Sequence, residues 1–347
     1  MQFDVNDYRT YYTDLLCELM AVPSPSGYWR EVMELVRRKA EENGASFSLT
    51  RKGCGIITVK GASEGEALGA CAHCDTLGAM VRSVDAGGGI NFTVVGGPQL
   101  PTLDGEYCTV ITGEGKKYTG TILSKSPASH VYSDAKTRER SAENMYVRLD
   151  EVVKTAEDVR ALGIENGDYI CFDPKTAVTE SGYIKSRFLD DKASVACLLT
   201  CVHILHEKGI VPPRDLKILI TMYEEVGHGA ASVPDGICEM LGVDMGCIGE
   251  DLSCTEHDVS ICAKDSGGPY DYAMTKRLIS LAKENGLSYA VDIYPYYGSD
   301  VEAMWRAGHD VPGALIGTGV HASHGMERTH LDGVFNTVAL ILLYFGV

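Results

Sequence analysis

The sequence is poor in basic residues. Its 347 residues include 31 Lys and Arg against 48 Asp and Glu, which gives a formal net charge of −17. It holds no basic cluster that could neutralise a run of phosphates, so we expect no nucleic-acid binding and no attraction to an anionic membrane. Most of the acidic excess favours solubility, but part of it can converge to hold cations.

Long apolar runs are also missing. The longest, near residues 195–205, is too short to span a bilayer and contains His203. The chain begins without the basic and apolar regions of a secretory signal peptide. Twelve cysteines spread over this length do not form a dense disulfide scaffold. We therefore expect a cytoplasmic protein whose thiols are mostly free.

The predicted elements indicate two domains, the number that the length also suggests. At both ends of the chain, helical and strand-like segments alternate, which is typical of a mainly parallel sheet with helices on both faces. In the middle, short apolar stretches are separated by turn residues, which is typical of a β-rich domain. We predict an α/β domain formed by residues 1–77 and 183–347, with a β-rich domain of residues 78–182 inserted into it.

Side chains that can bind metals follow several predicted strands or begin a predicted helix. In an open α/β sheet, functional sites form beyond the carboxyl ends of the strands. None of these positions carries a glycine loop of the phosphate-binding kind. The candidates are His73 and Asp75, Asp190 and Asp191, Glu224 and Glu225, Asp244, and His321 and His324.

These residue types suit a pair of divalent ions. Imidazole nitrogen and carboxylate oxygen ligate zinc, cobalt or manganese. Two close ions need a bridging carboxylate, and a further carboxylate outside the ligand set can take a proton from water. Taken singly, His73 can be structural, and Asp190-Asp191 can cap a helix. The adjacent Glu224-Glu225 after an apolar strand is harder to explain without a cation or a proton.

Several motifs, in this order, resemble a known peptidase family. They are Ala72-His73-Cys74-Asp75-Thr76-Leu77-Gly78, Leu189-Asp190-Asp191-Lys192, Glu224-Glu225-Val226-Gly227, Gly298-Ser299-Asp300, and Ala322-Ser323-His324-Gly325-Met326-Glu327. Together they resemble the glutamyl/tetrahedral aminopeptidase family (peptidase family M forty-two, clan MH) over nearly the whole chain. Tyr270-Asp271-Tyr272 and residues 326–330 resemble a subgroup associated with the osmolyte N-acetylglutaminylglutamine amide.

The resemblance implies a role for each candidate residue. Asp190 would bridge two ions, His73 and Asp244 would bind one of them, and Glu225 and His324 would bind the other. Glu224 would be the general base, Asp75 would orient the His73 imidazole, and Asp300 would contact the substrate. Asp191, Asp251 and His321 remain alternatives to Asp190, Asp244 and His324.

The family implies a dinuclear metal-dependent aminopeptidase that hydrolyses the N-terminal peptide bond of short peptides through a metal-bridged hydroxide. Each chain would hold two divalent ions, zinc or cobalt before manganese, and chains would assemble into homo-oligomers from dimers to dodecamers. Two alternatives stay open: an amidohydrolase acting on a small N-acetylated dipeptide amide osmolyte, and a glycosidase with two carboxylates. Only Trp29 and Trp305 are available for stacking on a sugar.

Overall fold

Two units divide the chain in the computed structural model, which describes residues 3–347. The first unit comprises the chain up to Asp75 and from Lys175 onward, and the second comprises Thr76–Pro174. The second boundary lies earlier than the predicted residue 182. The reason is that β10 (Ala177–Val178) and β11 (Tyr183–Ser186) form a three-stranded sheet with β19 (Glu327–His330), which belongs to the first unit.

The first unit is built on a ten-stranded mixed sheet with the order β1-β2-β12-β3-β13-β18-β15-β16. Its centre is parallel and consists of β12 (Arg214–Thr221), β3 (Ser63–His73), β13 (Ile237–Val243) and β18 (Gly313–Val320). Antiparallel pairs flank this centre, through β1 (Ser46–Leu49) and β2 (Gly55–Val59) on one side and β15 (Val259–Asp265) on the other. Three short strands complete the set: β14 (Gly246–Cys247), β16 (Gly268–Pro269) and β17 (Tyr289–Ile293).

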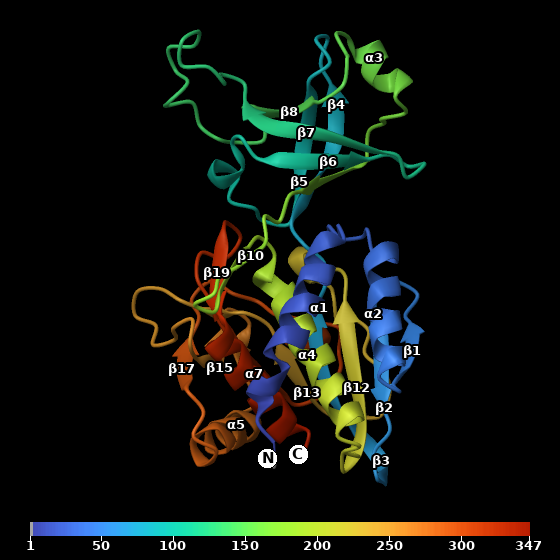
Figure 1. The fold of residues 1–347 in the computed structure, drawn as a ribbon, viewed down its shortest axis with the longest axis vertical. Helices are drawn as coiled ribbons and strands as arrows, with labels where there is room; N and C mark the ends of the chain where they lie inside the picture. Colours follow the sequence, from blue (N-terminus) through green and yellow to red (C-terminus); the bar gives the residue numbers. More distant parts are fainter. Residues whose placement is uncertain (1–2) are drawn as a thin grey trace. The chain divides into compact units, whose positions relative to one another are not determined.

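Helices cover both faces of the sheet, since every residue of β18 is buried. α1 (Arg9–Ala21) packs on α4 (Leu189–Glu207), which packs on α7 (Leu331–Tyr344), and α4 and α7 lie over the central strands (Figure 1). α4 is buried on nearly all sides, as expected for a helix enclosed by a sheet and other helices. The remaining helices are α2 (Arg30–Glu42), α5 (Tyr272–Glu284) and α6 (Asp300–Arg306), with 3₁₀ turns at Val5–Tyr8 and Glu224–Val226.

α6 lies unusually close to the sheet. It packs on β3, β13 and β18, and a Cβ atom on Gly242 would lie 2.9 Å from Val301 of α6. A larger residue at 242 would push α6 away from the strands. Because α6 begins at Asp300 and ends at Arg306, its distance from the sheet also fixes where these two residues lie.

The second unit is a closed β-barrel, which confirms the predicted β-rich texture. Its strands follow the order β4-β5-β8-β7-β6-β9. The short helix α3 (Ala156–Ala161) was not predicted, because six residues carry too little periodicity; it begins with a capping box between Thr155 and Asp158. The strands are β4 (Gly78–Val84), β5 (Ile90–Val95), β6 (Tyr107–Ile111), β7 (Lys117–Ser124), β8 (Met145–Leu149) and β9 (Tyr169–Phe172), with a 3₁₀ turn at Leu100–Leu103.

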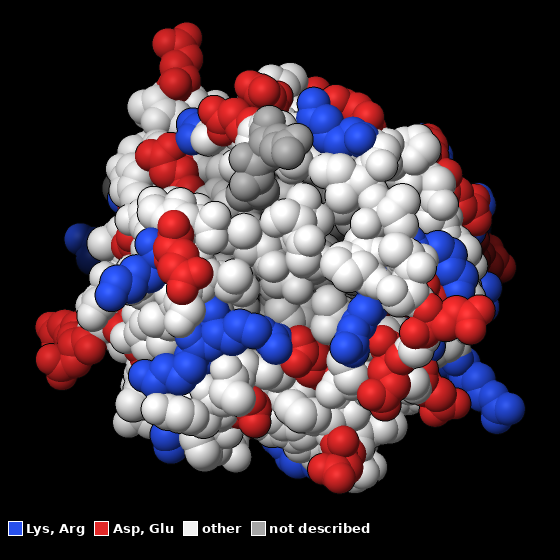
Figure 2. Space-filling model, turned by 90° about the horizontal axis from the view of Figure 1, so that it is seen from below, with Lys and Arg blue, Asp and Glu red and all other residues white. Residues whose placement is uncertain are grey.

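α5 begins at Tyr272, because Gly268 and Pro269 pair with β15 and the side chain of Asp271 caps the helix. No helix within residues 3–347 combines the length and apolarity needed to cross a membrane. The twelve cysteines are unpaired. On the face that Figure 2 shows, acidic and basic side chains are interspersed around a largely uncharged centre.

Candidate metal centre

The candidate residues gather at one edge of the parallel sheet. β12, β3, β13 and β18 are consecutive neighbours, and Thr221 at the end of β12 pairs with His73 at the end of β3. Because parallel strands end at the same edge, the residues that follow them meet there. This edge carries His73, Glu224, Glu225, Asp244 and His324.

Asp190 lies between two histidines. Its Oδ1 is 3.0 Å from His73 Nε2, and its Oδ2 is 3.6 Å from His324 Nε2. Its backbone N–H donates a hydrogen bond to Glu327 Oε2 at 3.1 Å. A carboxylate whose two oxygens face two separate imidazole nitrogens has the arrangement expected of a bridge between two cations.

Two groups of ligand atoms share His73, and in each group the atoms lie within 4.8 Å of one another. One group joins His73 to Asp190 and Glu225, and the other joins it to Asp191 and Asp244. Glu225 Oε2 is 3.6 Å from His324 Nε2, while Asp244 Oδ2 is 4.0 Å from His73 Nε2. Glu225 and His324 therefore lie together, and Asp244 lies with His73.

Asp191 contacts the site differently from Asp190. It is fully buried, and its Oδ2 accepts a hydrogen bond from the backbone N–H of His73 at 3.2 Å. It does not line the cavity over the site, whereas Asp190 does. The geometry thus favours Asp190 as the bridging residue.

Burial and position in the cavity wall also separate Asp244 from Asp251 and His324 from His321. Asp244 is buried and His324 half-buried, and both line the cavity. Asp251 and His321 are exposed and do not line it. The backbone of His321 instead pairs with that of Arg328. The geometry favours Asp244 and His324.

The site concentrates buried negative charge. Burial raises the pKa values of Glu224 and Glu225 well above their usual range, and the neighbouring carboxylates add to the shift, Asp244 for Glu224 and Asp190 for Glu225. Burial and Asp190 raise the pKa of Asp244 to about 7. Burial also acts on Asp190, but the hydrogen bond to His73 and the charges of both histidines hold its pKa below the usual value.

One buried acceptor in the site lacks a partner that a metal ion could supply. Glu225 Oε1 is buried and has no hydrogen-bond partner, so it is an acceptor that a cation would satisfy. Cations would also relieve the repulsion that raises the carboxylate pKa values. A donor set of imidazole nitrogens and carboxylate oxygens suits zinc, cobalt or manganese. The residues present therefore fit two divalent ions.

Asp75 contacts the loop with the two glutamates as well as His73. His73 Nδ1 is 3.0 Å from the backbone carbonyl of Asp75 and 3.6 Å from its carboxylate, so the carbonyl, not the expected carboxylate, makes the closer contact. The carboxylate accepts hydrogen bonds from the backbone N–H groups of Glu224 and Glu225, at 3.2 and 3.3 Å. Asp75 thus fixes the start of this loop.

Asp300 lies behind the site. Its carboxylate accepts hydrogen bonds from the Thr221 hydroxyl and, at 2.8 Å, from the backbone N–H of Ala230. A Cβ on Gly229 would lie 2.2 Å from Asp300 Oδ1, so the loop after Glu225 depends on a glycine here. Ser299, next to Asp300, lines the cavity instead.

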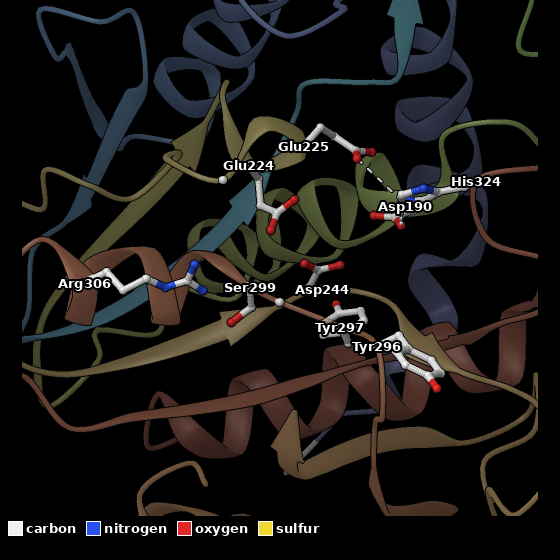
Figure 3. A pocket seen from close by; sticks show the side chains of 11 residues that line it. Asp190, Glu224, Glu225, Asp244, Tyr296, Tyr297, Ser299, Arg306 and His324 are labelled. Carbon is white, nitrogen blue, oxygen red and sulfur yellow. Dashed lines mark ion pairs between the residues drawn. The ribbon is translucent and has the colours of Figure 1, made fainter. Parts of the chain in front are cut away.

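A cavity of about 300 Å³ opens over these side chains (Figure 3). Three residues of the cavity wall, Tyr296, Tyr297 and Arg306, were not predicted from the sequence, because a search for metal-ligating side chains passes over tyrosine and arginine. Its lining comprises Asp190, Glu224, Glu225, Gly227, Asp244, Tyr296, Tyr297, Gly298, Ser299, Arg306 and His324.

Known proteins resemble this chain over most of its length. Residues 53–340 match the family described as M42 glutamyl aminopeptidase. A protein of Bacillus subtilis named "Putative aminopeptidase YhfE" is 43% identical over 332 residues, which cover 95% of this chain and 96% of that protein.

Solved structures share the fold. A TET aminopeptidase from the marine sediment archaeon Thaumarchaeota archaeon SCGC AB-539-E09 has a TM-score of 0.87 at 20% identity and covers 96% of both chains. The TET1 peptidase of Pyrococcus horikoshii, described as able to assemble into a tetrahedron or a large octahedral shell, has a TM-score of 0.83 at 20% identity. That match covers 95% of this chain and 98% of the other.

Proposed function

The chain belongs to the M42 glutamyl aminopeptidase family, and on this premise we propose that it removes the N-terminal residue of short peptides at the Asp190 site, which would hold two divalent ions. Membership makes the chain a metal-dependent aminopeptidase, a hydrolase. The position of Asp190 supports the number of ions, because its two oxygens face His73 and His324 separately.

The other ligands follow from this division. His73 and Asp244 would hold one ion, and Glu225 and His324 the other, with Asp190 shared between them. When bound, the ions would polarise the peptide carbonyl and lower the pKa of water. Zinc or cobalt is our first choice and manganese the second, because all three accept nitrogen and carboxylate oxygen ligands.

Glu224 is proposed as the general base. Its Oε2 is 3.8 Å from His73 Nε2, and the residue lines the cavity. Burial and neighbouring carboxylates raise its pKa, which moves it toward the range in which a carboxylate both takes and returns a proton near neutral pH. It would take a proton from water at Oε2 and pass it to the leaving amine. Asp75 holds the Glu224 backbone by hydrogen bonding to its N–H.

Assembly and location are proposed on other grounds. We propose that the chain forms a homo-oligomer, from a dimer to a dodecamer, because the Pyrococcus horikoshii neighbour is described as assembling into closed shells. A cytoplasmic location is proposed from the twelve unpaired cysteines. Neither the amidohydrolase nor the glycosidase alternative is favoured by the comparisons, which support an aminopeptidase.

The proposal is tested with protein loaded with zinc or cobalt. We expect two ions per chain by elemental analysis, and turnover of unblocked dipeptides but not of their N-acetylated forms. Hydrolysis of blocked substrates alone would contradict the aminopeptidase assignment, and absence of bound metal would contradict the site. Activity that survives a chelator would support the glycosidase instead.

A further inference from the structure

One basic side chain stands apart in the cavity wall. Among the described residues that line the cavity, Arg306 is the one Lys or Arg. The four carboxylates of the lining, those of Asp190, Glu224, Glu225 and Asp244, already have roles as proposed ligands or proton acceptor. Arg306 has no part in that chemistry, so its presence in the wall needs another explanation.

Arg306 lies away from Glu225 and His324, the proposed ligands of one of the two ions. Figure 3 shows it across the cavity from His324 and Glu225, with Ser299 and Glu224 between them. A peptide whose scissile bond lies near Asp190 and Glu224 therefore has room to extend toward Arg306. The cavity, at about 300 Å³, is at the small end of the range for ligand sites. It therefore holds only a short substrate, and few groups of that substrate can reach Arg306.

A buried carboxyl group anchors Arg306 at one edge. Its Nη2 forms an ion pair with Glu302, whose side chain is only 3% exposed, while that of Arg306 is 63% exposed. Glu302 also accepts a hydrogen bond from the backbone N–H of Gly267 at 2.7 Å. The guanidinium is therefore held in place before a ligand arrives, and only part of its five-donor fork is used by Glu302.

Glu302 does not neutralise this arginine fully. Burial and the neighbouring Asp265 raise the pKa of Glu302 to about 7, so near neutral pH it is partly protonated. Asp265 in turn accepts a hydrogen bond from the Tyr270 hydroxyl, which also lies 2.7 Å from Ser299 Oγ in the cavity wall. The two buried carboxyl groups are thus satisfied within the protein, and positive charge remains at the cavity mouth.

We propose that Arg306 binds a carboxylate of the substrate. This carboxylate is either the side chain of an acidic N-terminal residue or the free C-terminal carboxylate of a dipeptide. Arginine and carboxylate form paired, charge-assisted hydrogen bonds, which makes this arrangement selective for the charged group over a neutral amide of the same shape. The inference rests on the proposed function, since it assumes that a peptide occupies the cavity.

The test compares ligands that differ only in one carboxylate. Glutamyl-alanine amide is paired with glutaminyl-alanine amide, and alanyl-alanine with alanyl-alanine amide. Binding is measured by calorimetry to the zinc-loaded Glu224→Gln protein, so that the ligand is not consumed. The same titrations are made with Arg306→Met added, and with Arg277→Met as a control, because Arg277 also pairs with a glutamate, Glu239, but lines a different cavity.

We expect one pair to show tighter binding of its carboxylate member, by roughly ten- to a hundredfold, since hydrogen bonds to charged groups are worth that much. Preference within the glutamyl pair identifies an acidic side chain, and preference within the alanyl pair identifies a C-terminal carboxylate. Arg306→Met should abolish the preference and leave the neutral members within about threefold. Arg277→Met should leave it intact.

Three results would overturn the inference: no preference in either pair, a preference that survives Arg306→Met, or equal weakening of both members of each pair. If Arg306→Met does not fold, Arg306→Lys keeps the charge without the planar fork and should reduce the preference; an unchanged preference would again count against it. Turnover by the wild-type protein is scored separately, so failure of the proposed function does not alter the binding result.

Discussion

The hydroxyl of Ser26 donates a hydrogen bond to Oδ2 of Asp75 at 2.5 Å. Both residues are buried, and the same carboxylate accepts the backbone N–H groups of Glu224 and Glu225. The segment before α2 is therefore tied, through Asp75, to the loop that carries the proposed base and one proposed ligand. This link joins residues that are far apart in the sequence and explains why the turn at Ser26 matters to the metal centre.

Removing the Ser26 hydroxyl should impair catalysis more than it impairs folding. Ser26→Ala deletes a hydrogen bond to a buried carboxylate, which costs about 1–3 kcal/mol, and it loosens the support of the Glu224 loop. Ser24→Ala is a matched control, because Ser24 is buried and donates instead to the backbone carbonyl of Cys74 at 2.8 Å. We expect Ser26→Ala to lower kcat/KM severalfold more than Ser24→Ala at similar loss of Tm. Equal effects on kcat/KM would contradict this role.

Substitutions of the adjacent Glu224 and Glu225 should affect different steps, proton transfer for Glu224 and metal binding for Glu225. Glu224→Gln keeps the shape of the side chain but cannot accept a proton, so we expect kcat to fall by roughly 10²–10⁴-fold while both ions remain bound. Glu225→Gln should lower the metal content, because Glu225 lies beside His324 and an amide is a weaker ligand. Elemental analysis and kinetics on the same preparations distinguish the two. Loss of metal from Glu224→Gln would place that residue among the ligands.

Substitution of His324 can be compared with substitution of His321 as its control. His324→Ala should remove one of the two ions and most of the activity, because His324 Nε2 faces Asp190 and Glu225. The backbone at His324 is left-handed, with φ of 62°, a conformation that histidine adopts more often than alanine, so Tm is measured alongside the metal content. His321→Ala should retain two ions, because His321 is exposed and only its backbone is paired. Retention of both ions by His324→Ala would refute the assignment.

The sequence was sufficient to predict the elements that carry the site. Strand lengths, apolar runs and the residues that follow them placed His73, Glu224 and Asp244 at strand ends, and the parallel centre of the sheet brings these ends together. Asp190 was found because it begins a long apolar helix. These features are local, and a single periodicity or motif marks each of them.

Other features depend on contacts between distant segments and leave no local signal. The pairing of β11 with β19 joins residues near 185 to residues near 328, which is why the domain boundary was placed too late. Arg306 lies at the end of α6, which packs closely on the sheet at Gly242, and it lines the cavity. Asp300 was expected to contact substrate from its motif, yet its carboxylate holds the loop at Ala230. In each of these cases the tertiary contact decides the position of the residue.

The stability of the metal-free protein should depend on pH through Asp244. Burial and Asp190 raise the pKa of Asp244 from 3.8 to about 7. Because its pKa in the folded protein lies above that in the unfolded chain, its contribution to stability is complete below about pH 4 and is lost as the pH rises through about 7. Asp244→Asn removes this charge and should therefore stabilise the metal-free protein more at pH 7 than at pH 5, by about 2 kcal/mol at most.

Metal binding should reverse that order, because the wild-type protein gains stability from ions that Asp244 helps to hold. Denaturation is measured from pH 5 to pH 8 with a chelator and again with excess zinc, and Asp251→Asn serves as an exposed control outside the cavity. The control should show no difference that grows with pH. A gain from Asp244→Asn that stays constant across the pH range, or that persists with zinc, would show that Asp244 is not a metal-binding carboxylate held at raised pKa by its neighbours.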